Sequence, residues 1–187
     1  MELHKKKKDM KKIFITLVLI VSGLTAQAQE GLTWYQDMSK AVEASRQERK
    51  PMFLFFTGSD WCGWCMRLQN EVFKTPEFVS WAKEHAVLVE LDYPRRTPQP
   101  EDIKQQNAQL QQMFQVQGYP TVWFVKPVLK DDGKINLEQL GSTGYVAGGP
   151  SKWIEGANEI IAKYTPDSKP ETDKKVTSKK STKKKKA

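Results

Sequence analysis

The chain has 187 residues, of which 28% are charged, and it carries a formal net charge of +8 with only two cysteines. The excess lysines lie before residue 13 and from residue 163 onward, so the segment between them is mildly acidic. This distribution argues against a basic nucleic-acid-binding domain, and we expect no nucleic-acid partner. Two cysteines are also too few for a small disulfide-rich secreted protein.

The first 28 residues have the three parts of a secretory signal peptide. A lysine-rich start precedes an apolar run over residues 13–24, and Ala26-Gln27-Ala28 supplies an A-x-A cleavage signal. A membrane anchor is the alternative, but a spanning helix needs about 20 apolar residues and this run is shorter. We therefore predict export, to the periplasm of a Gram-negative bacterium, where disulfides form and persist.

Helical and strand patterns alternate after the signal peptide. The continuous apolar run over residues 52–56 is typical of a strand that is buried on both faces of a sheet. Residues at three- and four-residue spacing from Cys62 onward predict a helix, so the cysteine pair lies where a strand, a loop and a helix meet. The predicted helices lie within 33–50 and at 62–73, 75–85, 101–114 and 148–164, and the predicted strands are 52–56, 86–91, 121–125 and 135–140.

This order of elements predicts one α/β domain over residues 29–164, with helices on both faces of a central mixed sheet and a hairpin near its end. Residues 165–187 are rich in Lys, Ser, Thr, Asp and Pro, and such a segment buries too little apolar surface to fold. We predict a disordered lysine-rich tail. It is interpreted either as a solvated segment or as a weak contact with an anionic surface.

Both cysteines lie in the segment Asp60-Trp61-Cys62-Gly63-Trp64-Cys65, and three interpretations compete. A structural zinc site needs four ligands, whereas His85 is the only histidine left once the signal peptide is removed, so we expect no metal. A structural disulfide across so short a loop would stabilise the fold by about 2 kcal/mol, against about 4.7 kcal/mol for a 100-residue loop. We also expect an exposed pair, because it begins a helix.

Redox chemistry is the interpretation that remains. The attacking species in disulfide exchange is a thiolate, and the start of a helix favours negative charge through unpaired N–H groups and the helix dipole. Cys62 is therefore the predicted nucleophile, and Cys65, one turn later, the resolving thiol. Trp61 either packs at the rim or forms an apolar lip for the substrate, and Trp64 is expected to face solvent and to contact a partner or shield the disulfide.

Two motifs together resemble the thioredoxin superfamily: FFTGSDWCGWC at 55–65 and GYPTVWFV at 118–125. They are similar to the family's W-C-x-x-C helix start and its G-x-P-T segment, and the resemblance covers about 33–164. It looks closest to exported thioredoxin-like domains, such as the periplasmic domain of membrane disulfide reductases. The resemblance implies a thioredoxin-like α/β/α sandwich and a cis bond between Tyr119 and Pro120 that faces the cysteines. It also implies substrate contact by Tyr119 and Pro120, with Pro120 keeping metal away from the thiols.

The sequence departs from the family at two places. A buried carboxylate on the strand before the cysteines is replaced by Phe55-Phe56, and Glu90 on the next strand either substitutes as the proton acceptor or faces solvent. Gly63-Trp64, between the cysteines, matches no family dipeptide that indicates the direction of electron flow.

The predicted function is an exported thiol-disulfide oxidoreductase that needs no cofactor and exchanges electrons with protein thiols and disulfides and with an unidentified redox partner. We expect a monomer. The alternative is a peptide-binding or chaperone-like module of the same fold, with a redox-inert disulfide.

Overall fold

A computed structural model describes residues 31–166 of the chain. The predicted signal peptide and nearly all of the predicted tail lie outside these residues. Among the residues that are described, no helix combines the length and the apolar character needed to cross a membrane.

Within the described residues, five strands form one mixed sheet in the order β1-β3-β2-β4-β5. The first three of these neighbours, β1, β3 and β2, run parallel to one another, and β4 and β5 are added antiparallel as a hairpin. The strands are β1 (Trp34–Tyr35), β2 (Met52–Thr57), β3 (Val87–Asp92), β4 (Thr121–Leu129) and β5 (Ile135–Thr143). The prediction of a central mixed sheet is confirmed.

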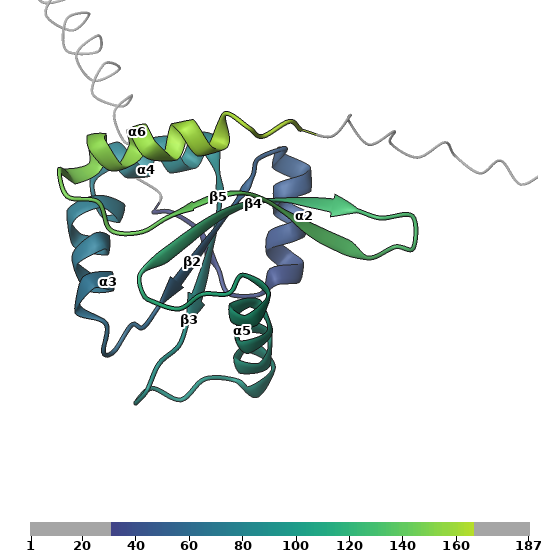
Figure 1. The fold of residues 1–187 in the computed structure, drawn as a ribbon, viewed down its shortest axis with the longest axis horizontal. Helices are drawn as coiled ribbons and strands as arrows, with labels where there is room; N and C mark the ends of the chain where they lie inside the picture. Colours follow the sequence, from purple (N-terminus) through teal and green to yellow (C-terminus); the bar gives the residue numbers. More distant parts are fainter. Residues whose placement is uncertain (1–30, 167–187) are drawn as a thin grey trace, which may run out of the picture. The chain divides into compact units, whose positions relative to one another are not determined.

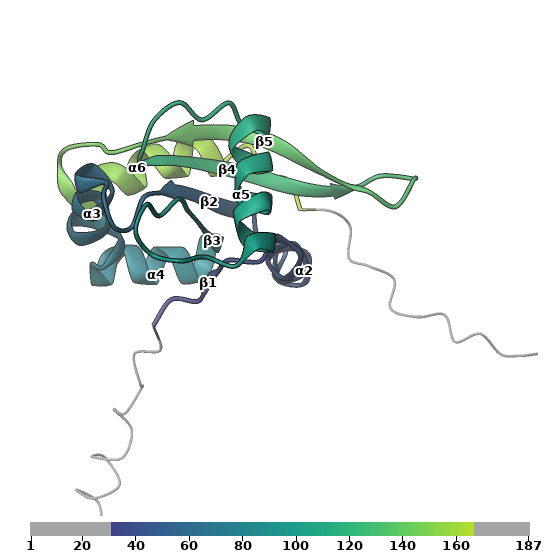
Figure 2. The same ribbon diagram turned by 90° about the horizontal axis from the view of Figure 1, so that it is seen from below.

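Helices cover both faces of the sheet, as Figures 1 and 2 show. The helices α2 (Met38–Glu48) and α5 (Glu101–Met113) pack on one face. The other face carries α3 (Gly63–Leu68), the π-helical turn η2 (Gln69–Phe73), α4 (Pro76–His85) and α6 (Gly149–Ile161). This arrangement confirms the predicted α/β/α sandwich.

The strand β2 lies at the centre of both hydrophobic layers, and all six of its residues are buried. On the α3 side, the Phe53 ring lies 5.3–6.0 Å, between ring centroids, from the rings of Trp34, Phe73, Phe78, Phe124 and Trp153. On the α2 side, Leu54 and Phe56 join a cluster with Val89 and Leu110. Alternate residues of β2 therefore fill opposite layers, and the strand end that precedes the cysteines is rigidly packed.

Three details differ from the prediction. The edge strand β1 was not predicted, because two residues carry no periodicity. The helix predicted over 62–73 is instead α3 followed by η2, where the N–H of Lys74 donates to the carbonyl of Gln69 at 2.9 Å, a π-type bond. The strand β4 was predicted to end at Val125 but continues through Pro127 to Leu129. Beyond Val125 it pairs only with β5, so it behaves as an edge strand, where proline is tolerated.

Candidate active site

Cys62 and Cys65 begin the helix α3 and are joined by a disulfide. Cys62 is the N-cap residue with an extended backbone, and its Sγ accepts a hydrogen bond from the backbone N–H of Cys65 at 3.2 Å. The expectation of an exposed pair was wrong: Cys62 is 6% exposed and Cys65 is fully buried. Cys65 lies on the inward face of α3, one turn before the buried Leu68, which explains its burial.

The Trp61 side chain connects the two predicted motifs. Its ring packs edge-on against the Tyr119 ring at a centroid distance of 5.5 Å, and its Nε1–H donates to the carbonyl of Tyr93 at 2.8 Å. A Cβ on Gly58 would lie 2.4 Å from the indole, so only glycine leaves room for this ring position. The loop from Gly58 to Trp61 therefore sets the side chain next to Cys62 in a fixed place.

The peptide bond between Tyr119 and Pro120 is cis. Tyr119 lies against Tyr93 as well as Trp61, with ring centroids 5.3 Å apart. Burial raises the pKa of both tyrosines, so both hydroxyls are neutral at physiological pH. The Pro120 carbonyl lies 3.1 Å from the position that a Cβ on Gly144 would take, so the segment after β5 approaches this loop closely.

Trp64, between the cysteines, is 56% exposed, and its ring is held by contacts with neighbouring side chains. Its ring lies 5.2 Å from that of Tyr145, and the guanidinium carbon of Arg67 lies 5.3 Å from each ring centroid. Glu71 accepts hydrogen bonds from the Tyr145 hydroxyl at 2.6 Å and from Arg67 at 2.7 Å, and these two bonds lower the pKa of Glu71. The indole is thus presented to solvent by a connected group of side chains.

Asp60 was not predicted as a functional residue, yet it holds the loop that follows β3. Its carboxylate accepts hydrogen bonds from the backbone N–H groups of Arg95, Arg96 and Thr97 at 3.0, 2.7 and 2.9 Å. The bond from Arg95 is the largest contribution that lowers the pKa of Asp60 to about 2. The partners of Asp60 lie more than 30 residues away along the chain, so no local sequence pattern identifies them.

A second carboxylate ties the same two loops together. Asp92, at the end of β3, accepts hydrogen bonds from the backbone N–H of Ser59 at 2.8 Å and from its hydroxyl at 2.6 Å. Ser59, Asp60 and Trp61 are consecutive, and each forms a hydrogen bond with the end of β3 or the loop after it. These bonds join the loop before Cys62 to that segment. The approach to Cys62 is therefore shaped by tertiary contacts.

Glu90 is half-buried on β3, where it pairs with Phe55 of β2. Residues paired in a parallel sheet point to the same face, so Glu90 lies on the face that α3 covers. Burial raises the pKa of this carboxyl, Asp92 adds to the increase, and a hydrogen bond with Gln36 opposes it. Glu90 is therefore neither fully solvated nor joined to the cysteines by a hydrogen bond.

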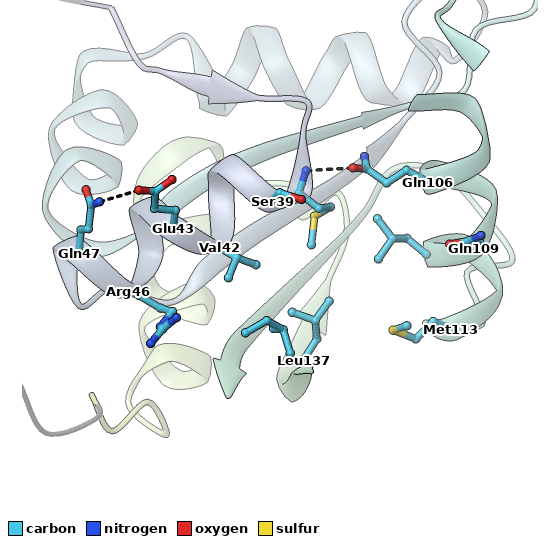
Figure 3. Close-up of a pocket in the computed structure, with 12 residues that line it drawn as sticks. Ser39, Val42, Glu43, Arg46, Gln47, Gln106, Gln109, Met113 and Leu137 are labelled. Atoms are coloured by element: carbon cyan, nitrogen blue, oxygen red, sulfur yellow. Dashed lines mark hydrogen bonds between the residues drawn. The ribbon is translucent and has the colours of Figure 1, made fainter. Parts of the chain in front are cut away.

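A cavity of about 670 Å³ lies elsewhere, between α2, α5 and β5. Figure 3 shows its walls, whose apolar members are Met38, Val42, Leu110, Met113, Ile135 and Leu137. None of the residues that line it comes from α3 or from the loops beside the disulfide. The cavity and the Cys62–Cys65 disulfide are thus separate features. Within residues 31–166, no group of three or more His, Cys, Asp or Glu side chains is arranged to hold a metal ion.

Comparisons with known proteins agree with this geometry. A thioredoxin-like family model matches residues 33–127. The chain is 37% identical over 120 residues to the disulfide bond reductase DsbH of Chlamydia pneumoniae, covering 64% of this chain and 72% of DsbH. It is 32% identical over 142 residues to the thioredoxin-related protein DsbJ of the same organism, covering 73% of this chain but only 39% of DsbJ.

The structure is similar to that of a DsbH oxidoreductase, with a TM-score of 0.60 and 34% sequence identity over 71% of this chain and 85% of that one. The family match spans half of the chain and includes the strand, loop and helix that carry Cys62 and Cys65. The chain therefore belongs to the thioredoxin-like family, and it is a thiol-disulfide oxidoreductase.

Proposed function

We propose that the protein is an exported reductase of protein disulfides whose redox-active group is the pair Cys62–Cys65. The observation that carries this proposal is the position of Cys62 at the N-cap of α3, where its sulfur accepts the N–H of Cys65. An N–H donor and a helix start both stabilise a thiolate relative to a thiol. The name of the relative DsbH, a disulfide bond reductase, supports the reductive direction.

The reaction has two exchange steps. The Cys62 thiolate attacks one sulfur of the substrate disulfide, which forms a mixed disulfide and releases the other substrate sulfur as a thiolate that takes up a proton. Cys65 then loses its proton and attacks the Cys62 sulfur, which releases the second substrate thiolate. The substrate gains two electrons and two protons, and the enzyme is left with the Cys62–Cys65 disulfide for a redox partner to reduce.

Four side chains around the pair are proposed to bind the substrate. Tyr119 and Pro120 present a backbone segment to which an extended peptide adds as a strand. Trp61 forms one wall, since its ring is fixed against Tyr119. Trp64 is the exposed aromatic surface on the other side, and aromatic side chains in such positions are frequent contributors to protein recognition.

Glu90 is the proposed proton acceptor for Cys65. Burial raises its pKa, which favours the uptake of a proton by this carboxylate. Glu90 also lies on the sheet face that is covered by α3, the helix that carries Cys65. The region that matches the missing family carboxylate is Phe55-Phe56, and Phe55 pairs directly with Glu90.

The localisation and the domain limits remain part of the proposal. Residues 1–28 are proposed as a cleaved signal peptide, residues 29–164 as the thioredoxin-like domain and residues 165–187 as a solvated tail, with a weak contact to an anionic surface as the alternative. Sequencing the N-terminus of the mature protein tests the first of these, since cleavage after Ala28 leaves Gln29 as the first residue. Unchanged vesicle binding at low salt after deletion of residues 165–187 would exclude the surface contact.

The reduction potential of the couple tests the proposed activity. We expect a value nearer the roughly −270 mV of thioredoxin than the roughly −120 mV of a strong oxidant, measured by equilibration with a thiol redox buffer. In a separate assay, we also expect the reduced protein to reduce a disulfide-bonded protein substrate. A potential well below about −300 mV, typical of structural disulfides, together with no turnover, would contradict the proposal.

A further inference from the structure

The loop after β3 places two arginines beside the proposed substrate-binding residues. The guanidinium carbon of Arg95 lies 3.8 Å from the centroid of the Trp61 ring, and that ring contacts the Tyr119 ring. Arg96 is the next residue, and both side chains are exposed. A peptide that extends along Tyr119 therefore passes close to the Arg95 guanidinium group, and Arg96 follows directly on the same loop.

The backbone that carries these arginines is held in place. Asp60 accepts hydrogen bonds from the N–H groups of Arg95, Arg96 and Thr97, and the Thr97 hydroxyl also lies within 3.3 Å of the same carboxylate. Asp60 directly precedes Trp61, so the arginines keep their position relative to the substrate wall. A fixed backbone reduces the conformational entropy that is lost when the side chains bind a partner.

The charged groups nearby leave the two guanidinium groups available. Within residues 31–166, neither Arg95 nor Arg96 forms a salt bridge, whereas Arg67 is bonded to Glu71 at 2.7 Å. The carboxylates of Asp60 and Asp92 are both engaged, Asp60 by backbone N–H groups of this loop and Asp92 by Ser59. Among the described residues, no carboxylate is paired with either guanidinium group, and that of Arg95 lies over the Trp61 ring.

We propose that Arg95 and Arg96 bind acidic side chains next to the substrate's disulfide, so that the enzyme prefers acidic protein segments. The inference rests on the proposed function of Cys62 and Cys65. Carboxylates are the expected ligands because the planar guanidinium donates two parallel hydrogen bonds to them. The exposure of both arginines limits the preference to a modest one that is sensitive to salt.

Peptides that share one disulfide loop but differ in their flanking residues test this proposal. We expect kcat/KM for an Asp-Asp flank to exceed that for a Ser-Ser flank by about three- to fivefold at low ionic strength, chiefly through KM. A Lys-Lys flank should be reduced more slowly than either, and the differences should shrink in high salt.

Variants of Arg95 and Arg96 test whether these two residues cause the preference for acidic peptides. The ratio of acidic to neutral kcat/KM should fall in Arg95→Gln and Arg96→Gln, approach one in the double variant, and be kept only in part in Arg95→Lys, which retains the charge but not the planar pair of donors. The matched control is Arg46→Gln, which removes the same charge from the exposed surface of α2 and should retain the wild-type ratio. Arg96→Gln is the cleaner single variant, because Arg95 also contacts Trp61.

The outcomes separate this inference from the activity on which it rests. Equal rates on all three peptides, or an unchanged ratio in the double variant, would overturn the acidic preference while leaving disulfide reduction intact. If the wild-type protein reduced none of the peptides, the proposed function would fail, and the preference would fail with it.

Discussion

The sulfur of Cys62 lies 3.2 Å from the backbone nitrogen of Cys65, in the first turn of α3. The same N–H is available to a thiolate once the disulfide is reduced. Cys62 retains 6% exposure, whereas Cys65 has none. The two thiols of the reduced protein are therefore expected to differ both in charge and in access.

Alkylation of the reduced protein measures this difference. We expect iodoacetamide to modify Cys62 at least tenfold faster than Cys65 at neutral pH, because the thiolate is the reactive form and only Cys62 reaches the surface. Quenching at several times and mapping the modified peptides by mass spectrometry gives both rates. Equal rates, or faster modification of Cys65, would contradict the assignment of roles.

Asp60 should titrate far below the ordinary aspartate. Its pKa is lowered to about 2 from 3.8 because its charged form accepts the N–H groups of the loop. The charged form is favoured by folding, so its contribution to stability is present above pH 3.8 and is lost as pH falls towards 2.

Amide chemical shifts of Arg95, Arg96 and Thr97 give the measurement. We expect them to move together with a midpoint near pH 2, and to lose this transition in Asp60→Asn. The control is Asp37→Asn, a change at the N-cap of α2 that should leave the transition of these three amides in place. A midpoint at or above 3.8 would show that the hydrogen bonds of Asp60 do not persist in solution.

Replacing Glu90 should have opposite effects on stability and activity. Burial raises its pKa, so the protonated form is the one that folding favours, and this contribution is lost as pH rises through the folded-state pKa. Glu90→Gln should therefore unfold at a higher urea concentration than the wild type at pH 7, with the gain vanishing below about pH 4.

The same variant tests the proton role. If Glu90 accepts the proton of Cys65, stopped-flow measurements on Glu90→Gln should show slower release of the mixed disulfide and a changed pH profile for that step. Unchanged release at every pH would reject the role but not the stability argument. Glu84→Gln, an exposed change on α4, is the control.

Phe53 should be among the costliest residues to truncate. It is fully buried and surrounded by five aromatic rings, so Phe53→Ala should lower the free energy of unfolding by about 3–5 kcal/mol. Leu129→Ala, at a position that is 49% exposed on the hairpin, should change it by less than about 0.5 kcal/mol. Urea denaturation of both variants provides the comparison, and similar losses would mean that the layer around Phe53 is not tightly packed.

The fold could be predicted where the sequence carries a strong local pattern. The apolar run that became β2 and the periodic helices α4 and α5 were identified to within about two residues, because burial alone dictates these patterns. The strand β1 was missed since it is defined by pairing with β3 and not by its own composition. The π-helical turn after α3 was likewise invisible, because it changes hydrogen bonds without changing the apolar spacing.

The sequence predicted the thiol-disulfide chemistry of the site, but it did not predict the hydrogen bonds that hold the surrounding loops. Two spaced motifs predicted that the segment with Trp61 and the segment with Tyr119 meet, and these two rings are in contact, although the burial of the cysteines was missed. The bonds of Asp60 to the loop at 95–97 join segments 35 to 37 residues apart. Partners so far apart in the chain are brought together by the tertiary structure, and no local sequence pattern identifies them.

Trapping of the mixed disulfide tests the central claim most directly. Cys65→Ser should accumulate a covalent adduct with a disulfide-bonded substrate, linked through Cys62 and released by added thiol, because the resolving sulfur is gone. Cys62→Ser should form little adduct under the same conditions, since Cys65 is fully buried. An adduct on Cys65 in the Cys62→Ser protein, with none on Cys62 in Cys65→Ser, would contradict the account.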